Sequence, residues 1–263
     1  MSRTATIPLE ATIDWARSRP GDGGEVLICA INLDRSTDRW EAIREQLDAS
    51  GLPYVRLSAV DGSTLDRSQE AKVSYPRFEQ SNGRKATPGD IGCYLSHATA
   101  WTLLASQPYR MLLIVEDDAV FQPGWTETLR DVISAYRPGM LMKLSWQRKG
   151  LVRDAGSINE TYKLVRPMWH QACCAAYLVD GAAAQGLLDH AFPIYVPVDH
   201  YMESPWENGV HVGSVMPSLA YQRGVPSTIA KQKKFHWTRR LPTLLYRVKA
   251  HSLRLWHNYL GTA

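Results

Sequence analysis

Three consecutive acids follow the strongest strand signal in the chain. Met111 to Val115 are all apolar, which predicts a buried strand, and Glu116, Asp117 and Asp118 come directly after it. In open α/β sheets, ligands bind beyond the carboxyl ends of the strands. Adjacent carboxylates repel one another, and a hard cation such as Mg²⁺ or Mn²⁺ relieves that repulsion because it prefers oxygen ligands. The pattern indicates a divalent-cation site that also takes phosphate groups; from these residues alone, a solvated turn is the alternative.

A polar segment follows the first predicted strand. Asn32 and Asp34 are candidates to hold a base and a ribose. Arg35 and Arg39 are candidates to pair with phosphates, because a guanidinium matches phosphate oxygens bidentately. The residues between the two arginines also predict a helix N-cap, and both interpretations can hold together.

Two glycines precede a serine and a histidine in the predicted helix 89–106. Gly89 and Gly92 allow close approach of another backbone. Ser96 and His97 have no obvious acid partner in the sequence, so a hydrolase triad is not predicted. A lone histidine on a helix is more often structural than functional.

A further carboxylate, Asp199, lies in the apolar segment from Pro197 to Tyr201. An aspartate near a metal site serves as a general base or as a metal ligand. The alternative is a helix N-cap. His200 and His211 are candidate metal ligands, although each alone is more often structural.

Strands and helices alternate along the chain. Strands are predicted at 26–33, 54–60, 111–115, 141–146 and 172–179, and helices at 38–50, 89–106, 125–136 and 181–190. This order predicts an α/β fold with a mainly parallel sheet flanked by helices. Residues 66–88 lack periodicity and are expected to form a long loop, whereas 147–171 matches no pattern.

The composition is that of a globular protein, with 44% hydrophobic and 21% charged residues. No apolar run reaches the roughly 18 residues of a membrane helix, and Met1 to Arg19 lacks the apolar centre of a secretory signal. The four cysteines, at positions 29, 93, 173 and 174, form no C-x-x-C pair. Buried free thiols in a reducing cytoplasm are expected, rather than disulfides or a zinc site.

The charge distribution is uneven. No Asp or Glu follows Glu207, so the net charge of +4 combines nine positive charges in the tail with −5 elsewhere. Leu241, Leu245 and Val248 share one side of a predicted helix, and Arg240 and Arg247 lie on another. Such a helix can lie in an anionic membrane surface, which predicts peripheral association with the cytoplasmic face. Packing on its own domain is the alternative, and nucleic-acid binding is not expected because no recognition motif is present.

Several of these segments, in this order, resemble glycosyltransferase family 25, the lipopolysaccharide-type galactosyltransferases related to collagen galactosyltransferases. The matching segments are 31–39, 59–62, 89–97, 113–118 and 197–201, with a weaker match at 217–222. The resemblance covers about residues 26–222.

The resemblance implies a GT-A-like fold and an inverting transfer of a hexose, such as galactose from UDP-galactose, to a glycan or lipid-linked saccharide in surface-polysaccharide assembly. It implies that Asp118 and Glu116 bind Mn²⁺ or Mg²⁺, with Glu116 nearer the ribose. Asp199 would be a base or a metal ligand. The donor-binding set would comprise Asn32, Asp34, Arg35, Arg39, Asp61, Ser96, His97, Glu116 and Asp117.

The expected organisation is a lead-in at 1–24, a transferase domain at 25–226 and a basic amphipathic helical segment at 227–263. Trp146, Trp169 and Trp206 are candidates to stack on sugars, although tryptophan is also a core residue. Two alternatives remain: a module that binds a nucleotide-sugar without catalysis, and a transferase that uses another UDP-sugar.

Overall fold

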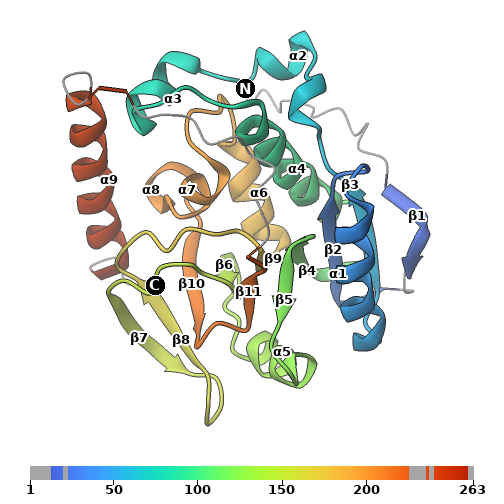
Figure 1. Ribbon diagram of the computed structural model, residues 1–263. Helices are drawn as coiled ribbons and strands as arrows, with labels where there is room; N and C mark the ends of the chain where they lie inside the picture. The colour runs from blue at the N-terminus through green and yellow to red at the C-terminus, as the bar shows by residue number, and fades with distance from the viewer. Residues whose placement is uncertain (1–12, 20–22, 225–234, 237–239, 260–263) are drawn as a thin grey trace.

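The computed structural model describes residues 13–19, 23–224, 235–236 and 240–259. Within these residues, a nine-stranded sheet runs through the centre of the molecule in the order β1-β3-β2-β4-β9-β6-β10-β8-β7 (Figure 1). The strands are β1 (Ile13–Arg19), β2 (Gly24–Asn32), β3 (Tyr54–Ser58), β4 (Tyr109–Glu116), β6 (Met140–Lys143), β7 (Val152–Ser157), β8 (Lys163–Pro167), β9 (Ala176–Asp180) and β10 (His211–Met216). A short pair, β5 (Ala119–Phe121) and β11 (Ala220–Gln222), forms a separate ladder.

Each face of the sheet is covered by its own hydrophobic core. Along β2, Leu27 and Cys29 belong to one core and Ile28 and Ala30 to the other, because successive side chains of a strand point to opposite faces. The first core includes α4 (Pro88–Leu104), α6 (Gly181–Asp189) and α7 (Val198–Met202). The second includes α1 (Thr37–Ser50) and α5 (Trp125–Ser134). The expected α/β class, with helices on both faces, is confirmed.

The sheet is mixed, so the expectation of a mainly parallel sheet was wrong. β2 runs parallel to β3 and β4, and β6 runs parallel to β10, but the other pairs of neighbours are antiparallel. β4 and β6, joined through α5, do share a direction, as a helical crossover requires. β9 follows the β7–β8 hairpin in the chain rather than a helix. It lies between β4 and β6 in the sheet and is antiparallel to both.

The segment 66–88 is not a long loop, as was expected. It contains α2 (Arg67–Glu70), which begins with a capping box from Asp66 to Gln69, and α3 (Tyr75–Asn82), which buries Phe78. Both helices are shorter than the roughly 11-residue window in which periodicity is informative. β1 was not expected either, and it extends the sheet by pairing antiparallel with β3.

The last helix, α9 (Leu241–Tyr259), lies on one side of the molecule against α3 and α8 (Pro205–Asn208) (Figure 1). Its fully buried residues are polar. Arg254 donates a hydrogen bond to the carbonyl of Glu203 at 3.2 Å, and Asn258 donates one to the carbonyl of Pro167 at 2.6 Å. Its large apolar side chains are instead exposed: Leu241, Leu244, Leu245, Val248, Trp256 and Tyr259. Among the described helices, none is long and apolar enough to cross a membrane.

Candidate active site at the carboxyl ends of β2, β3 and β4

A cavity of about 290 Å³ opens where β2, β3 and β4 end. Most of the candidate residues line it: Arg35, Arg39, Asp61, Ser96, His97, Glu116, Asp117 and Asp118. Asn32, Asp34 and Asp199 do not line it. The position agrees with the expectation that ligands bind beyond the carboxyl ends of strands.

One wall is formed where the loop after β3 packs tightly on α4. A Cβ atom on Gly92 would lie 2.5 Å from the carbonyl oxygen of Val60, and one on Gly62 would collide with the carbonyl of Pro88. Ser96 Oγ accepts a hydrogen bond from the amide of Val60 at 2.8 Å. Ser96 and the glycines therefore shape the cavity by joining two backbones, as expected for glycine at a close approach.

Asp117 is held by partners from the segment after β2. Its Oδ2 accepts a hydrogen bond from Asn32 Nδ2 at 2.8 Å, and its Oδ1 pairs with Arg39 Nη1 at 3.0 Å. Burial raises the pKa of Asp117, although these two partners oppose the shift. Asn32 thus acts behind the cavity wall, where it orients Asp117.

Only one of the two carboxyl oxygens of Asp118 has a hydrogen-bond donor among the described residues. Gln222 donates a hydrogen bond to Oδ2 at 2.9 Å, but no described residue donates one to Oδ1, which is buried. Burial, and then the charge of Glu116, raise the pKa of Asp118 to about 6. A buried carboxylate oxygen without a partner is costly, and a divalent cation would satisfy it. The residues therefore fit the metal that the sequence predicts.

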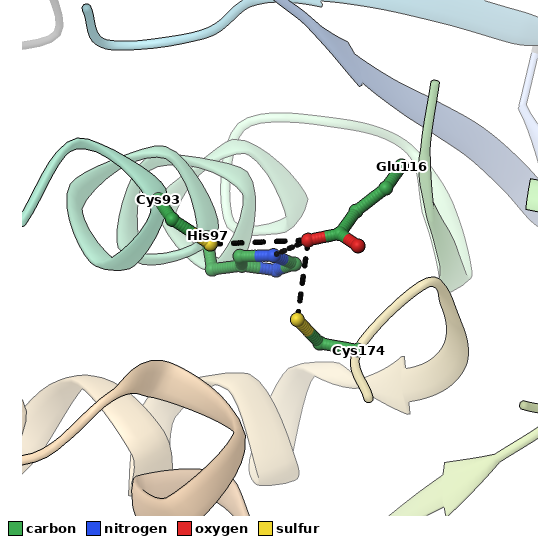
Figure 2. A group of neighbouring side chains, drawn as sticks. All are labelled: Cys93, His97, Glu116 and Cys174. Atoms are coloured by element: carbon green, nitrogen blue, oxygen red, sulfur yellow. Dashed lines mark hydrogen bonds and ion pairs between the residues drawn. The ribbon is translucent and has the colours of Figure 1, made fainter. Parts of the chain in front are cut away.

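Glu116 points toward α4 and the loop before β9 (Figure 2). Its Oε1 lies 3.2 Å from His97 Nε2 and 3.1 Å from Cys174 Sγ, with Cys93 Sγ at 3.8 Å. The sequence interpretation that His97 lacks an acid partner was wrong, because the partner comes from another element, 19 residues further along the chain.

The charges of this group depend on each other. Burial disfavours the imidazolium form of His97, but hydrogen bonds with Cys93 and Glu116 outweigh it and raise the pKa of His97 to about 9. Burial also opposes the ionised form of Glu116, yet His97 lowers the pKa of that carboxyl overall. A protonated imidazole beside an ionised carboxylate follows.

Three further candidates lie at the rim of the cavity or outside it. Arg35 forms an ion pair with Asp61 at the cavity wall, and both side chains are partly exposed. Asp34 instead binds Arg56 Nη2 at 2.7 Å and the hydroxyl of Ser58 at 2.7 Å. The buried Arg56, which sequence reasoning missed, also donates to Asn32 Oδ1 and so supports the amide that orients Asp117.

Asp199 lies in a separate group near the start of α7. Its Oδ2 is 3.8 Å from His170 Nε2, and the rings of His170 and His200 are 3.9 Å apart. Burial would raise its pKa, but the charges of His200 and His170 outweigh burial and lower the pKa of Asp199. The N-cap of α7 is Pro197, so the alternative of an N-cap at Asp199 does not hold. His211 lies on β10, outside this group.

None of the three tryptophans lines the cavity. Trp146 donates a hydrogen bond to the carbonyl of Val215, and Trp206 packs beneath Arg254 of α9. Trp169 is 48% exposed and lies against His251. In this arrangement Trp146 contacts β10, and Trp169 and Trp206 contact α9.

Comparison with known proteins decides the family. Residues 27–202, more than half of the chain, match the family described as Glycosyltransferase family 25 (LPS biosynthesis protein). The chain belongs to glycosyltransferase family 25. A mixed sheet with helices on both faces is consistent with the GT-A-like fold that membership in family 25 implies.

Individual relatives match parts of longer proteins. A Drosophila melanogaster "Glycosyltransferase 25 family member" is 32% identical over 114 residues, which are 42% of this chain and 19% of that protein. A Danio rerio "Procollagen galactosyltransferase 1" is 26% identical over 213 residues, 73% of this chain and 35% of that protein. A Bos taurus "Probable inactive glycosyltransferase 25 family member 3" is 24% identical over 246 residues, 81% of this chain and 41% of that protein. This family-25 chain thus spans less than half the length of these relatives.

Proposed function

We propose that this family-25 protein is a metal-dependent, inverting glycosyltransferase that moves galactose from UDP-galactose onto a glycan acceptor. The observation that carries the proposal is Asp118, which lines the cavity together with Arg35 and Arg39 and whose buried Oδ1 receives no hydrogen bond from any described residue. An anionic donor that brings a divalent cation would satisfy all three groups. The choice of galactose is supported by the name of the zebrafish relative.

The residues divide the work of the reaction as follows. Asp118 would hold Mn²⁺ or Mg²⁺ through Oδ1, and the bound ion supplies the charge that neutralises the departing diphosphate. Arg39, fixed by Asp117, would pair with a phosphate, and Arg35 would do so from the rim once it releases Asp61. Glu116, held by His97, would face the ribose. These contacts hold the donor in one orientation before attack.

Asp199 is the proposed base. Its lowered pKa keeps it ionised at neutral pH, so that it can accept the proton of the acceptor hydroxyl. It lies close enough to Glu116 for its charge to oppose, in small part, the lowering of the pKa of that carboxyl by His97. Attack by the hydroxyl on the face opposite the departing diphosphate would invert the anomeric centre.

The acceptor and location form the second half of the proposal. The exposed side chains Leu241, Leu244, Leu245 and Val248 form one face of α9, at the i, i+3, i+4 and i+7 spacing of a helix. Because the surrounding segment is rich in Lys and Arg, this face is suited to an anionic membrane surface. We therefore propose peripheral association with the cytoplasmic face of the membrane, where a lipid-linked saccharide for lipopolysaccharide or another surface polysaccharide would be the acceptor.

A screen of UDP-sugars tests the activity. Purified protein is incubated with each donor, an acceptor mixture and Mn²⁺, and released UDP is counted with and without chelator. We expect the largest Mn²⁺-dependent release from UDP-galactose. A larger release from another UDP-sugar would correct the donor. UDP binding without release from any donor would favour a non-catalytic nucleotide-sugar-binding module. The bovine relative is named as inactive, which is why this outcome is included in the test.

A further inference from the structure

We propose that Cys93, His97, Glu116 and Cys174 form a binding site for Zn²⁺, distinct from the Mn²⁺ or Mg²⁺ position at Asp118. One ligand atom from each of the four residues lies within 4.8 Å of every other. Two thiols and an imidazole suit zinc, whereas Mn²⁺ and Mg²⁺ prefer oxygen ligands.

The spacing of the ligand atoms is close to what a tetrahedral ion needs. With Zn–S of about 2.3 Å and Zn–N or Zn–O of about 2.0–2.1 Å, neighbouring ligand atoms are about 3.3–3.8 Å apart. Around Glu116 Oε1, the distances are 3.1 Å to Cys174 Sγ, 3.2 Å to His97 Nε2 and 3.8 Å to Cys93 Sγ. Each of these three distances is within about half an ångström of the tetrahedral spacing, and the other three pairs of ligand atoms lie within 4.8 Å.

Three separate elements hold these ligands in place. Cys93 and His97 are four residues apart on α4 and so share one face of the helix, and Glu116 ends β4 (Figure 2). Cys174 follows two residues in the left-handed region, Ala172 with φ 57° and Cys173 with φ 71°. Such a conformation is costly for residues with a side chain and often occurs at functional sites. Because the two ligand cysteines, Cys93 and Cys174, are far apart in sequence, their spacing shows no zinc motif.

The surroundings also suit a metal ligand. His97 Nδ1 is 2.8 Å from the hydroxyl of Tyr177, which in turn accepts a hydrogen bond from Trp101 at 2.9 Å. A metal-binding histidine usually has such a partner on its other nitrogen, which fixes the ring. Cys93, His97 and Glu116 line the cavity, so the ion has a path of entry. On binding, Zn²⁺ replaces the thiol protons of Cys93 and Cys174 and the Nε2 proton of His97, and these protons pass to solvent.

Substitution of Co²⁺ for Zn²⁺ tests the site without reference to activity. In the full-length protein under a non-thiol reductant, Co²⁺ should give thiolate-to-cobalt absorption in the near ultraviolet and tetrahedral bands in the visible, and Zn²⁺ should abolish both. Cys174→Ser should lose these bands and bind Zn²⁺ about 100-fold more weakly or worse, since even outer partners of a metal site contribute 10–100-fold. Cys173→Ser is the matched control, because its sulfur faces Ser145, and should keep the bands.

A measurement on the unaltered protein guards against misfolded variants. Zn²⁺ should slow alkylation of Cys93, the most exposed of the four cysteines, as followed by mass spectrometry. Absence of thiolate-to-cobalt bands in the wild type, or bands that survive Cys93→Ser and Cys174→Ser, would overturn the proposal. So would binding that needs only the other candidate group, His170, Asp199 and His200.

One consequence rests on the proposed function. Because Glu116 belongs both to this site and to the donor cavity, Zn²⁺ should inhibit glycosyl transfer in the wild type and in Cys173→Ser. If the cobalt bands appear but no transfer is ever detected, the zinc site stands and the proposed function fails. If transfer is detected without the bands, the reverse holds.

Discussion

The three carboxylates at 116–118 face three different sets of partners. Glu116 meets His97 and two thiols, and Asp117 meets Asn32 and Arg39. The protein itself thus offsets the repulsion that these two acids would suffer as neighbours. Only Asp118 keeps a buried oxygen without a described partner. The proposed divalent cation would therefore be held mainly by Asp118.

Replacement of Arg39 tests the donor-binding role. We expect Arg39→Ala to weaken Mn²⁺-dependent UDP binding by about tenfold or more, because a charged hydrogen bond to phosphate is lost and Asp117 loses its cation. Calorimetry measures this. Arg44→Ala is the control, since Arg44 lies on the same helix but pairs with Glu41. Equal UDP affinities in the two variants would remove Arg39 from the site.

Asp199→Asn separates two roles. If Asp199 is the base, kcat should fall by about 100-fold or more while Mn²⁺-dependent UDP affinity stays near the wild-type value. If Asp199 is a metal ligand, that affinity falls as well. Asp189→Asn, on the exposed side of α6, serves as the control. Wild-type kcat and affinity for Asp199→Asn would exclude both roles.

Sequence reasoning found residues but not their partners. The acids, the arginines and His97 were recognisable by type and by their position after strands or on a helix. Cys174 and Arg56 were not, because each acts through a residue that is distant in sequence. Gln222 had a signal in the weak match at 217–222, yet its contact with Asp118 depends on the β5–β11 ladder. Side-chain partners across elements follow from topology rather than from local pattern.

At the scale of elements, a buried ion pair joins β6 to the end of α7. Lys143 Nζ binds Glu203 Oε1, both side chains are almost fully buried, and His170 Nδ1 contacts the other carboxyl oxygen at 2.8 Å. Although burial opposes ionisation, Lys143 and His170 hold the pKa of Glu203 well below its ordinary value of 4.5. This carboxylate therefore stabilises the fold above about pH 4.5, and its contribution is lost as the pH falls further.

Lys143→Met should destabilise the protein by about 3–5 kcal/mol at pH 7, because it leaves a buried carboxylate without its main cation. Urea unfolding measures the effect. The pKa of Glu203 should rise in the variant, so its stability should fall less than that of the wild type as the pH drops below 4.5. Lys163→Met, which breaks the exposed pair with Asp154, should cost less than about 1 kcal/mol. Similar losses in both variants would contradict this interpretation.

The positions of the central strands β2, β3, β4, β6 and β9 and of helices α1, α4, α5 and α6 were predictable, but the outer strands and the strand directions were not. Continuous apolar runs such as Met111 to Val115 identify buried strands, but they do not show whether a strand pairs in a parallel or an antiparallel direction. Whether β9 would enter beside β4 from a helix or from a hairpin depends on residues 147–171, which carry no strong periodicity. The same limit applies to α2 and α3, which are fixed by capping and by packing of single residues such as Phe78.

At the scale of the whole molecule, α9 presents its apolar face outward. It is held to the body through Arg254 and Asn258, so changes on the outer face should leave the helix in place. Wild-type protein should sediment with anionic vesicles at low salt and be released at high salt. A triple variant, Leu244→Ser with Leu245→Ser and Val248→Ser, should sediment several-fold less.

The control for the vesicle experiment is Leu151→Ser, which alters an equally exposed leucine on the body. It should sediment as the wild type does. Circular dichroism checks that every variant is folded. If the triple variant and Leu151→Ser sediment equally, α9 is not the membrane-binding element.

Calorimetry of UDP binding by the wild type and by Asp118→Asn tests whether Asp118 holds a divalent cation at the donor site. We expect the wild type to bind UDP at least about 100-fold more tightly with Mn²⁺ than with chelator, because the proposed ion would neutralise charge on both Asp118 and the diphosphate. Asp118→Asn should stay folded, since it removes one of three crowded carboxylates, and should lose that Mn²⁺ dependence. Equal UDP affinity with and without Mn²⁺ in the wild type, or full Mn²⁺ dependence in Asp118→Asn, would contradict the account.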